Sequence, residues 1–407
     1  MTTIAERIRR RSWVEEKLFM GQSFPDYLAS LVTPFNILAG IVVLTGLVLG
    51  VQRFTMGLGA TTNLSDTNPW GLWIGFDVLC GVALAAGGYT MATAVYIFRL
   101  KEYQPIVRPA VLTGFLGYFF VVVGLCFDLG RPWRLPFPMF VSMGVTSIMF
   151  LVAWHVALYL TCQFVEFSPA VFEWLGWRRV RQWAVRLTLG ATIFGVMLST
   201  LHQSALGGLF LLAPGKLHPL WYSPLIPLFF FVSSIFAGIS IVIVESTLSH
   251  KAFAHQLDSD DDAHLERLTV GLAKAASVVM FTYFGIKLIG LMHGNGWSYL
   301  PTPLGEWYLV EMLGFVLLPC FLYAHGYLTR NVTLIRWTAF LTVIGVIVNR
   351  LNVSIIAFNW QEADRYVPRW SELLITLAIV TTMILTFRWI VNRMPVLRED
   401  PSYPSEF

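Results

Sequence analysis

Ten runs of about 20 apolar residues recur along this chain, and they limit its fold more strongly than any other feature. Each run is long enough to cross the roughly 30 Å hydrocarbon core of a bilayer as a helix. Hydrophobic residues make up 56% of the 407 residues and charged residues only 13%, against roughly 25% charged residues in soluble chains. The sequence therefore predicts an all-α polytopic membrane protein with ten transmembrane helices, and it excludes a soluble enzyme or a nucleic-acid-binding protein.

The predicted spans divide the chain into two tails and one membrane domain. The N-terminal tail covers 1–32, the ten-helix membrane domain 33–393 and the C-terminal tail 394–407. Within the first tail, Ile4–Phe19 mixes Arg, Glu and large apolar residues, which is typical of an amphipathic helix on a membrane surface. The predicted spans are 33–54, 70–98, 109–127, 141–165, 187–211, 224–249, 268–293, 306–327, 333–357 and 371–393.

Lys and Arg are distributed unevenly between the two sides of these spans. The N-terminal tail, the even-numbered loops and the C-terminal tail carry most of them. Because positively charged segments stay on the inside, both termini are predicted to be cytoplasmic and the odd-numbered loops to face the periplasm. In a bacterium this corresponds to the inner membrane, with outer loops that are too short to form a soluble domain but on which a partner could dock.

The four cysteines give no sign of a metal centre. Each lies singly inside an apolar segment, and no pair has the spacing of a zinc or iron–sulfur site. We therefore expect no metal site in this chain, and any iron–sulfur cluster must belong to another subunit.

Polar residues inside the spans are the candidates for function, because charge in the membrane is costly. With the predicted orientation and helical rise, most of them lie in the outer half of the membrane. Glu245 is near the inner end of span 6, and His155 is near mid-depth in span 4. The outer group consists of Asp77, Asp128, Arg131, His202, Gln203, Lys287, Glu311 and Arg350, with Trp70 among the aromatic residues at the outer interface.

An outward polar cluster suits a small amphiphile that enters sideways from the lipid. A quinone has this shape, and His or Asp side chains can relay the protons that its reduction requires. A second hypothesis is a proton- or ion-translocating module that uses His155, Glu245, Lys287, Glu311 and Arg350. A secondary transporter is a third, although its site should lie near the midplane between paired broken helices, which the sequence lacks.

Each polar position also has a purely structural interpretation. Lys287, Glu311 and Arg350 could form ion pairs between helices, and Asp128 with Arg131 could cap a helix end. His202 could bond across helices, and Glu245 could anchor span 6 at the inner interface. His202 and His155 could also ligate a b-type haem, but their different depths argue against it.

The chain also resembles the NrfD/PsrC family of integral-membrane quinone-interacting subunits. Within it the resemblance is to the branch holding the HybB subunit of periplasmic nickel–iron hydrogenases and the DsrP and HmcC subunits of sulfate reducers. The matching stretches include "PWGLWIGFD" (69–77), "DLGRPW" (128–133), "LHQSALGGL" (201–209), "IVIVES" (241–246), "NRLNVSIIAFN" (349–359) and "PRWSELLIT" (368–376).

The resemblance implies two four-helix bundles, spans 2–5 (about 70–211) and 6–9 (about 224–357), with a peripheral helix at each end of the chain. It implies menaquinone or another quinone bound near the periplasmic face of the first bundle, by Asp77, Asp128, Arg131, His202 and Gln203. It further implies a periplasmic ferredoxin-like iron–sulfur subunit, with a multihaem cytochrome c, a hydrogenase or other redox subunits beyond it, and no haem in this chain. Relatives carry a glutamate in span 4 where this chain has Leu151; His155, on the same helix face, is the candidate replacement.

Overall fold

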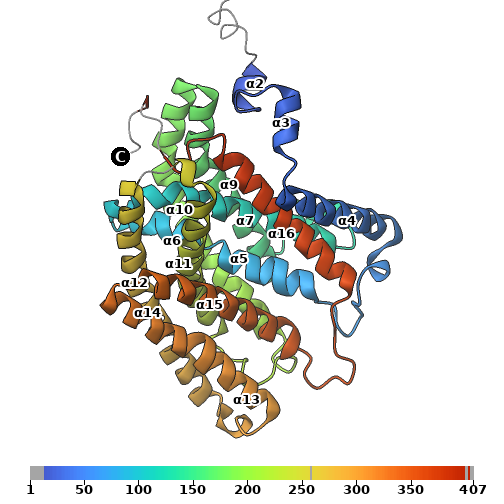
Figure 1. The fold of residues 1–407 in the computed structure, drawn as a ribbon. Coiled ribbons are helices and arrows are strands. Elements are labelled where there is room, and N and C mark those ends of the chain that lie inside the picture. Colours follow the sequence, from blue (N-terminus) through green and yellow to red (C-terminus); the bar gives the residue numbers. More distant parts are fainter. Residues whose placement is uncertain (1–12, 257–258, 399–401, 404–407) are drawn as a thin grey trace, which may run out of the picture.

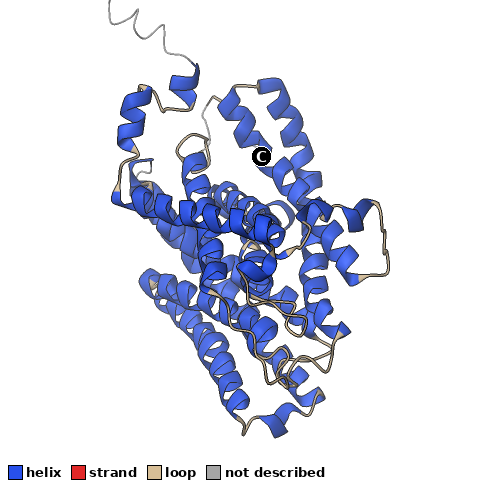
Figure 2. Ribbon diagram, turned by 90° about the vertical axis from the view of Figure 1, so that its right-hand side faces the viewer, coloured by secondary structure: helices blue, strands red, loops and turns tan. Residues whose placement is uncertain are grey.

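The computed structural model describes residues 13–256, 259–398 and 402–403. Within these residues the protein consists of helices and loops (Figure 2), and pairing of β type is limited to one bridge between Leu217 and Phe358. Ten helical segments in the described residues are long and apolar enough to span a membrane. The prediction of an all-α polytopic membrane protein with ten spans is confirmed.

Several spans are composed of more than one helical segment. In chain order they are α4 (Pro34–Met56); η2, α5, α6 and η3 (Trp73–Cys80, Gly81–Leu84, Gly87–Ala92 and Thr93–Ile97); η4 and α7 (Lys101–Ile106 and Val107–Asp128); α9 (Ile148–Leu175); α10 and η6 (Arg178–Gly208 and Leu209–Leu212); α11 (Ile226–Ala252); α12 (Ser259–His293); α13, η9 and α14 (Pro303–Leu309, Val310–Leu317 and Leu318–Thr329); α15 and η10 (Val332–Leu351 and Asn352–Ile356); and α16 (Trp370–Val391).

Spans 2–5 pack around one another as one group of four helices, and spans 6–9 form a second group (Figure 1). The two groups meet where α11 contacts α5, α6 and α10, and where α15 contacts η2. At the first of these contacts Gly238 lies so close to span 2 that a Cβ there would come within 2.7 Å of the Ala86 backbone. Small residues allow such close helix packing in a membrane. The flanking helices α4 and α16 pack on each other, α16 also packs on α7, and α4 contacts Phe127 near the end of α7 through Phe54, so both cover the first bundle.

The described parts of the two tails lie together at one end of the molecule (Figure 1). Arg393, just after α16, donates hydrogen bonds to the Leu18 carbonyl at 3.0 Å and to the Tyr27 hydroxyl at 2.8 Å. We call this end the terminal face and the opposite end, where α4 and α7 finish, the loop face. The expected amphipathic helix 4–19 falls mostly outside the described residues; α2 covers Trp13–Lys17 and is followed by α3, Phe24–Ser30.

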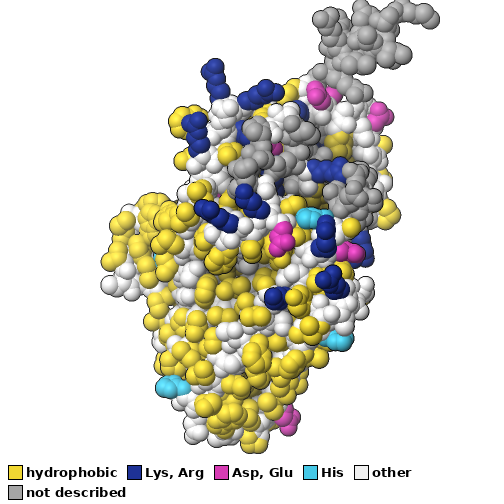
Figure 3. Space-filling model, turned by 90° about the vertical axis from the view of Figure 1, so that its left-hand side faces the viewer, with side chains coloured by type: hydrophobic (Ala, Val, Ile, Leu, Met, Phe, Trp, Pro, Cys, Tyr) yellow, Lys and Arg dark blue, Asp and Glu magenta, His cyan; other side chains and the backbone are white. Residues whose placement is uncertain are grey.

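The surface in Figure 3 has the character expected of a membrane protein. Lys and Arg side chains gather toward the terminal face, and a broad hydrophobic surface extends below them. Large exposed apolar side chains such as Ile37, Leu44 and Trp337 contribute to the hydrophobic surface of the whole molecule. Apolar area of this extent is stable in contact with lipid rather than water.

The predicted bounds of span 4 are wrong. The prediction was 141–165, whereas α9 covers Ile148–Leu175 and therefore includes Glu166 and Glu173. Both carboxylates have partners from neighbouring helices: Thr192 donates to Glu166 at 2.5 Å, and Arg108 and Arg181 bind Glu173. Tertiary contacts of this kind, which hydropathy does not record, allow the helix to continue through charged residues.

Candidate functional site

The structure separates the predicted quinone-site residues into distinct places. His202 and Gln203 lie inside the first bundle, whereas Asp77 and Asp128 lie toward the flanking helices α4 and α16. Arg131 is exposed in the loop after α7. Trp70 lies before η2, where its ring stacks on Phe358 at 5.5 Å and meets Phe210 edge-on at 5.7 Å.

His202 is fully buried on α10 and has a hydrogen-bond partner at each ring nitrogen. Its Nδ1 lies 2.8 Å from the Leu198 carbonyl oxygen, and its Nε2 contacts the Tyr118 hydroxyl on α7. A carbonyl can only accept, so Nδ1 carries the hydrogen and Nε2 accepts from Tyr118 in the neutral ring. The pair is therefore arranged to pass a proton between a phenol and an imidazole.

Gln203 connects this pair to span 2. Its side-chain nitrogen donates to the Val82 carbonyl at 3.0 Å and lies 3.4 Å from the Tyr118 hydroxyl. On the other side, Tyr159 packs edge-on against Tyr118 at 4.7 Å and receives a hydrogen bond from Gln163 at 3.1 Å. A continuous row of polar groups thus lies buried in the first bundle, which we call the His202 row.

Asp77 lies on the π-helical segment η2, near the loop face. Thr376 of α16 donates to its Oδ2 at 2.9 Å, and Gly124 of α7 allows its close approach, because a Cβ there would lie 2.8 Å from the Asp77 Cβ. π-helical turns are frequent at functional sites because they shift side chains out of the regular α-helical positions. Here the segment directs Asp77 toward spans 3 and 10.

Two buried polar atoms close to Asp77 are unsatisfied. Trp73, which also lies on η2, is 1% exposed, and its indole Nε1 has no hydrogen-bond partner among the described residues. The same holds for Oδ1 of Asp128 at the end of α7. The nearby guanidinium group of Arg53 donates a hydrogen bond to the Phe127 carbonyl at 2.6 Å. Within the described residues it forms no ion pair with Asp128. We use the name Asp77 pocket for this set of four residues, Trp73, Asp77, Asp128 and Arg53.

The charged residues of the second bundle form their own network. Glu311, 1% exposed, accepts hydrogen bonds from Trp221 at 2.7 Å, Asn349 at 2.6 Å and Asn352 at 2.5 Å. Arg350 donates to Asn349 at 2.7 Å and, among the described residues, forms no ion pair with Glu311. Lys287 lies over the rings of Phe229 and Tyr308 at 4.8 and 5.3 Å, and within the described chain it forms no ion pair with Glu311. The structural interpretation as direct ion pairs is therefore wrong, because amide and indole donors satisfy Glu311.

His155 and Glu245 each keep one buried polar atom unsatisfied. In the described residues neither Nδ1 of His155 nor Oε2 of Glu245 has a hydrogen-bond partner, although Oε1 of Glu245 accepts from Ser249 at 2.8 Å. Glu245 borders two cavities in the terminal half of the protein. Proton-carrying groups with an open hydrogen-bonding position can connect to water chains.

Several site residues were missed by the sequence analysis. Arg53 lies inside the first predicted span. A charged residue inside a span is a candidate for function, so Arg53 could have been identified from the sequence. Tyr118 is a phenol in mid-span, away from the interfacial position typical of tyrosine. Trp73 was interpreted only as one of the aromatic residues at the outer interface. Thr376 gave no signal, because isolated Thr side chains are common in apolar helices.

A haem between His202 and His155 does not fit this geometry. Both ring nitrogens of His202 are engaged, and Tyr118 and Tyr159 lie 5.2 and 5.4 Å from the imidazole centroid, where a macrocycle would have to enter. Among the described residues, no group of three or more His, Cys, Asp or Glu could hold a metal ion.

We therefore expect the purified subunit to lack a b-type optical spectrum. The measurement is a dithionite-reduced minus oxidised difference spectrum, together with a pyridine haemochrome assay on the isolated chain. One haem per chain would contradict the geometry around His202, whereas haem that co-purifies only with other subunits would not.

The loops of the loop face interlock into a compact layer. Asn359 donates from its backbone to Lys216 at 2.7 Å and from its side chain to Thr67 at 2.7 Å. His218 packs against Trp360 with ring centroids 4.7 Å apart, and burial lowers the pKa of its imidazole, which favours the neutral ring. Loops from both bundles thus form one continuous surface above the Asp77 pocket.

The chain is similar to known membrane proteins over most of its length. A family model described as polysulphide reductase, NrfD, matches residues 60–359. A protein of Nitratidesulfovibrio vulgaris with no descriptive name is 56% identical over 92% of this chain and 97% of its own length. The probable Ni/Fe-hydrogenase 2 b-type cytochrome subunit of Escherichia coli K12 is 32% identical, with 89% of this chain and 92% of its own covered. The menaquinone reductase integral membrane subunit of N. vulgaris is 27% identical, with 87% and 89% covered. The chain is therefore a multi-pass membrane protein of the NrfD family.

Proposed function

We propose that this chain is the quinone-binding membrane subunit of a multi-subunit respiratory electron-transfer complex. Its family consists of membrane subunits of quinone-linked oxidoreductases, and relatives are named as subunits of a hydrogenase and of a menaquinone reductase. The ligand is menaquinone or another quinone. The chain supplies the pocket and the protons, and a partner supplies the redox centres.

The unsatisfied groups of the Asp77 pocket carry this proposal. A buried donor or acceptor without a partner costs about 1–3 kcal/mol, so a ligand that satisfies it gains that free energy on binding. The Trp73 N–H suits a quinone carbonyl, and the Asp128 carboxylate suits a quinol hydroxyl. Asp77, held by Thr376, is close enough to Asp128 to interact with it electrostatically, and both carboxyl groups are candidates to exchange protons with the ring.

In this proposal the His202 row holds the protons that quinone chemistry consumes or releases. The Tyr118–His202 pair and Gln203 are joined to span 2 at Val82, a few residues along the helix that carries Asp77. His202 therefore acts as a proton-relay residue rather than as a direct ligand of the ring. Trp70, which packs against Phe210 and Phe358, and the exposed Arg131 both lie toward the loop face.

The proposed location is a bacterial inner membrane with both termini in the cytoplasm. The excess of Lys and Arg at the terminal face supports this orientation, which places the loop face in the periplasm. A ferredoxin-like iron–sulfur subunit docked there would bring a cluster close to the Asp77 pocket. A multihaem cytochrome c or a hydrogenase would then connect to that subunit.

Docking of such a partner is expected to protect the loop face. Cysteines introduced at exposed loop positions Asn63, Asp66 and Arg365 should react with a membrane-impermeant maleimide several-fold faster once the iron–sulfur subunit is deleted. A cysteine at exposed Arg330 on the terminal face is the control for membrane sealing and should stay unlabelled with and without the partner. Equal labelling with and without the partner would place the docking surface elsewhere.

A second candidate function, proton movement across the membrane, is favoured by the surroundings of Glu245. The carboxyl group lies between a cavity of about 100 Å³, bordered by His250 and His264 near the terminal face, and a larger apolar cavity. Glu245 thus lines a cavity that extends toward that side. His155, Lys287, Glu311 and Arg350 are the further candidates for this path.

The Glu245→Gln variant tests this second function. In sealed vesicles with quinone and an electron donor, we expect electron transfer to persist while proton uptake from the terminal side is lost, because glutamine cannot exchange a proton. The ratio of protons to electrons is measured with a pH-sensitive dye. Glu306→Gln, an exposed carboxylate near the loop face, is the matched control. An unchanged ratio in Glu245→Gln would make Glu245 a structural anchor.

A further inference from the structure

A large cavity opens between four spans in the terminal half of the protein, far along the helices from the Asp77 pocket. It has a volume of about 520 Å³ and lies among α4, α7, α11 and α16. This volume is within the roughly 300–1,000 Å³ of typical small-molecule sites. Its border includes Phe35, Leu248 and Ile384, which are 50%, 52% and 46% exposed, so the cavity is open toward the lipid-facing surface.

Two residues of the mostly apolar cavity wall, which also includes Ser249 and Arg388, carry unsatisfied polar atoms. These are Oε2 of Glu245 on α11 and Oγ1 of Thr113 on α7, both buried without a hydrogen-bond partner within the described chain. Both residues lie about 10 Å from the terminal ends of their helices, judged by helical rise. A hydrocarbon chain alone would leave both atoms unsatisfied at a cost of about 1–3 kcal/mol each.

The charges around the cavity favour an uncharged head group. Arg388 of α16 borders it nearer the terminal end, where it donates to Asn36 at 3.0 Å and lies over the Phe35 ring at 5.6 Å. One guanidinium and one carboxyl group together present no net charge. A phosphate group bound to Arg388 would lie in the same cavity as the Glu245 carboxyl group. Deeper in the cavity, beside Thr113, a charged head group would lose its hydration.

We propose that this cavity is a second binding site for a quinone or quinol, on the opposite side of the membrane from the Asp77 pocket. The ring oxygens bond to Thr113 and Glu245, and the isoprenoid tail leaves through the opening beside Leu248 and Ile384. The site binds without redox chemistry of its own. This second site depends on the proposed function only for the identity of its ligand, a quinone. The residues that form it are different from those of the Asp77 pocket.

The test is photolabelling of the intact complex with an azido-menaquinone analogue, followed by peptide mapping. Two separate groups of labelled peptides are expected, one at spans 2, 3 and 10 near Trp73 and one at 241–253 or 383–388. Ala252→Trp, which fills the cavity, should lower labelling of the second group by about tenfold or more, equivalent to about 1.4 kcal/mol of binding free energy. It should leave the first group and quinol oxidation unchanged. Thr113→Val, which removes only the hydroxyl group, should weaken labelling of the second group in the same direction.

Val278→Trp, at a 60% exposed position on α12 outside both sites, is the control and should change neither group. Label in the first group alone would overturn the second site and leave the proposed function standing. Label in the second group that is displaced by phosphatidylethanolamine but not by menaquinone would make the cavity a lipid site. Label in neither group would overturn the proposed function itself.

Discussion

A fully assembled complex carrying His202→Ala is expected to lose quinone-linked electron transfer by about 100-fold or more, the scale of a lost proton-transfer group. The imidazole accepts from Tyr118 and is fully buried, so no water can easily take its place in the relay. Asp77→Asn should have an effect of similar size, because the amide cannot exchange a proton with the ring. The measurement is the rate of quinol oxidation, or quinone reduction, by the purified complex.

Two further variants separate a chemical role from loss of packing. Tyr118→Phe keeps the ring contacts with Tyr159 and removes only the hydroxyl group, so we expect normal assembly with reduced turnover. His325→Ala removes an exposed histidine of α14 and should behave as wild type. Normal turnover by an assembled His202→Ala complex would remove His202 from the proposed mechanism.

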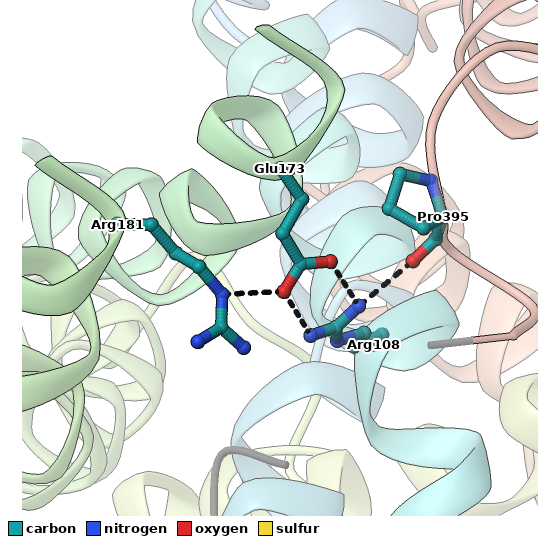
Figure 4. Close-up of polar contacts among 4 residues, drawn as sticks. All are labelled: Arg108, Glu173, Arg181 and Pro395. Atoms are coloured by element: carbon teal, nitrogen blue, oxygen red, sulfur yellow. Dashed lines mark hydrogen bonds and ion pairs between the residues drawn. The ribbon is translucent and has the colours of Figure 1, made fainter. Parts of the chain in front are cut away.

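The Glu173→Gln variant is expected to lower the free energy of unfolding by about 3–5 kcal/mol, the usual cost of removing one partner from a buried ion pair. Glu173 lies between two arginines (Figure 4): Arg108 binds it through two nitrogens at 2.9 Å each, and Arg181 through Nε at 2.7 Å. Its side chain is 1% exposed. With the neutral amide, both guanidinium groups lose their charge partner.

The same substitution should loosen the segment after α16. Arg108 also donates to the Pro395 carbonyl at 2.9 Å, so the ion pair holds this segment against the first bundle (Figure 4). We expect faster limited proteolysis around Pro395 together with the lower thermal midpoint of the solubilised protein.

Glu266→Gln provides the matched control for this measurement. Its pair with Arg336 is 3.9 Å long and exposed, with side-chain exposures of 53% and 29%, so its loss should cost about 1 kcal/mol or less. Equal midpoints for Glu173→Gln and the wild type would show that the buried cluster adds nothing to stability.

The sequence predicted the class of fold because the physical signal is local. A helix in a membrane has to form all its backbone hydrogen bonds within its own apolar segment, so ten apolar runs predict ten spans. It could not show that α4 and α16 pack side by side, because lateral packing depends on side-chain fit between helices distant in sequence. The end of span 4 was misplaced for the same reason, since Glu173 is tolerated only through Arg108 and Arg181.

The candidate site was predicted in part. Hydropathy identified Asp77, Asp128 and His202 as costly residues in one half of the membrane, and depth placed them together. The depth of a residue in the membrane does not say toward which neighbouring helix its side chain points. Depth alone therefore could not separate the Asp77 pocket from the His202 row. Gln163 Oε1 in the His202 row is also unsatisfied, so we propose the Asp77 pocket for the quinone ring because an open donor, Trp73 Nε1, and an open acceptor, Asp128 Oδ1, occur there together.

The most direct test of this account is an experimental structure of the intact complex with bound quinone. We expect ring density between spans 2, 3 and 10, with one carbonyl oxygen within about 3 Å of Trp73 Nε1, the distance of an N–H···O hydrogen bond. A ring bound elsewhere in the loop-face half, with Trp73 and Asp128 unchanged and without contact to it, would contradict the central claim.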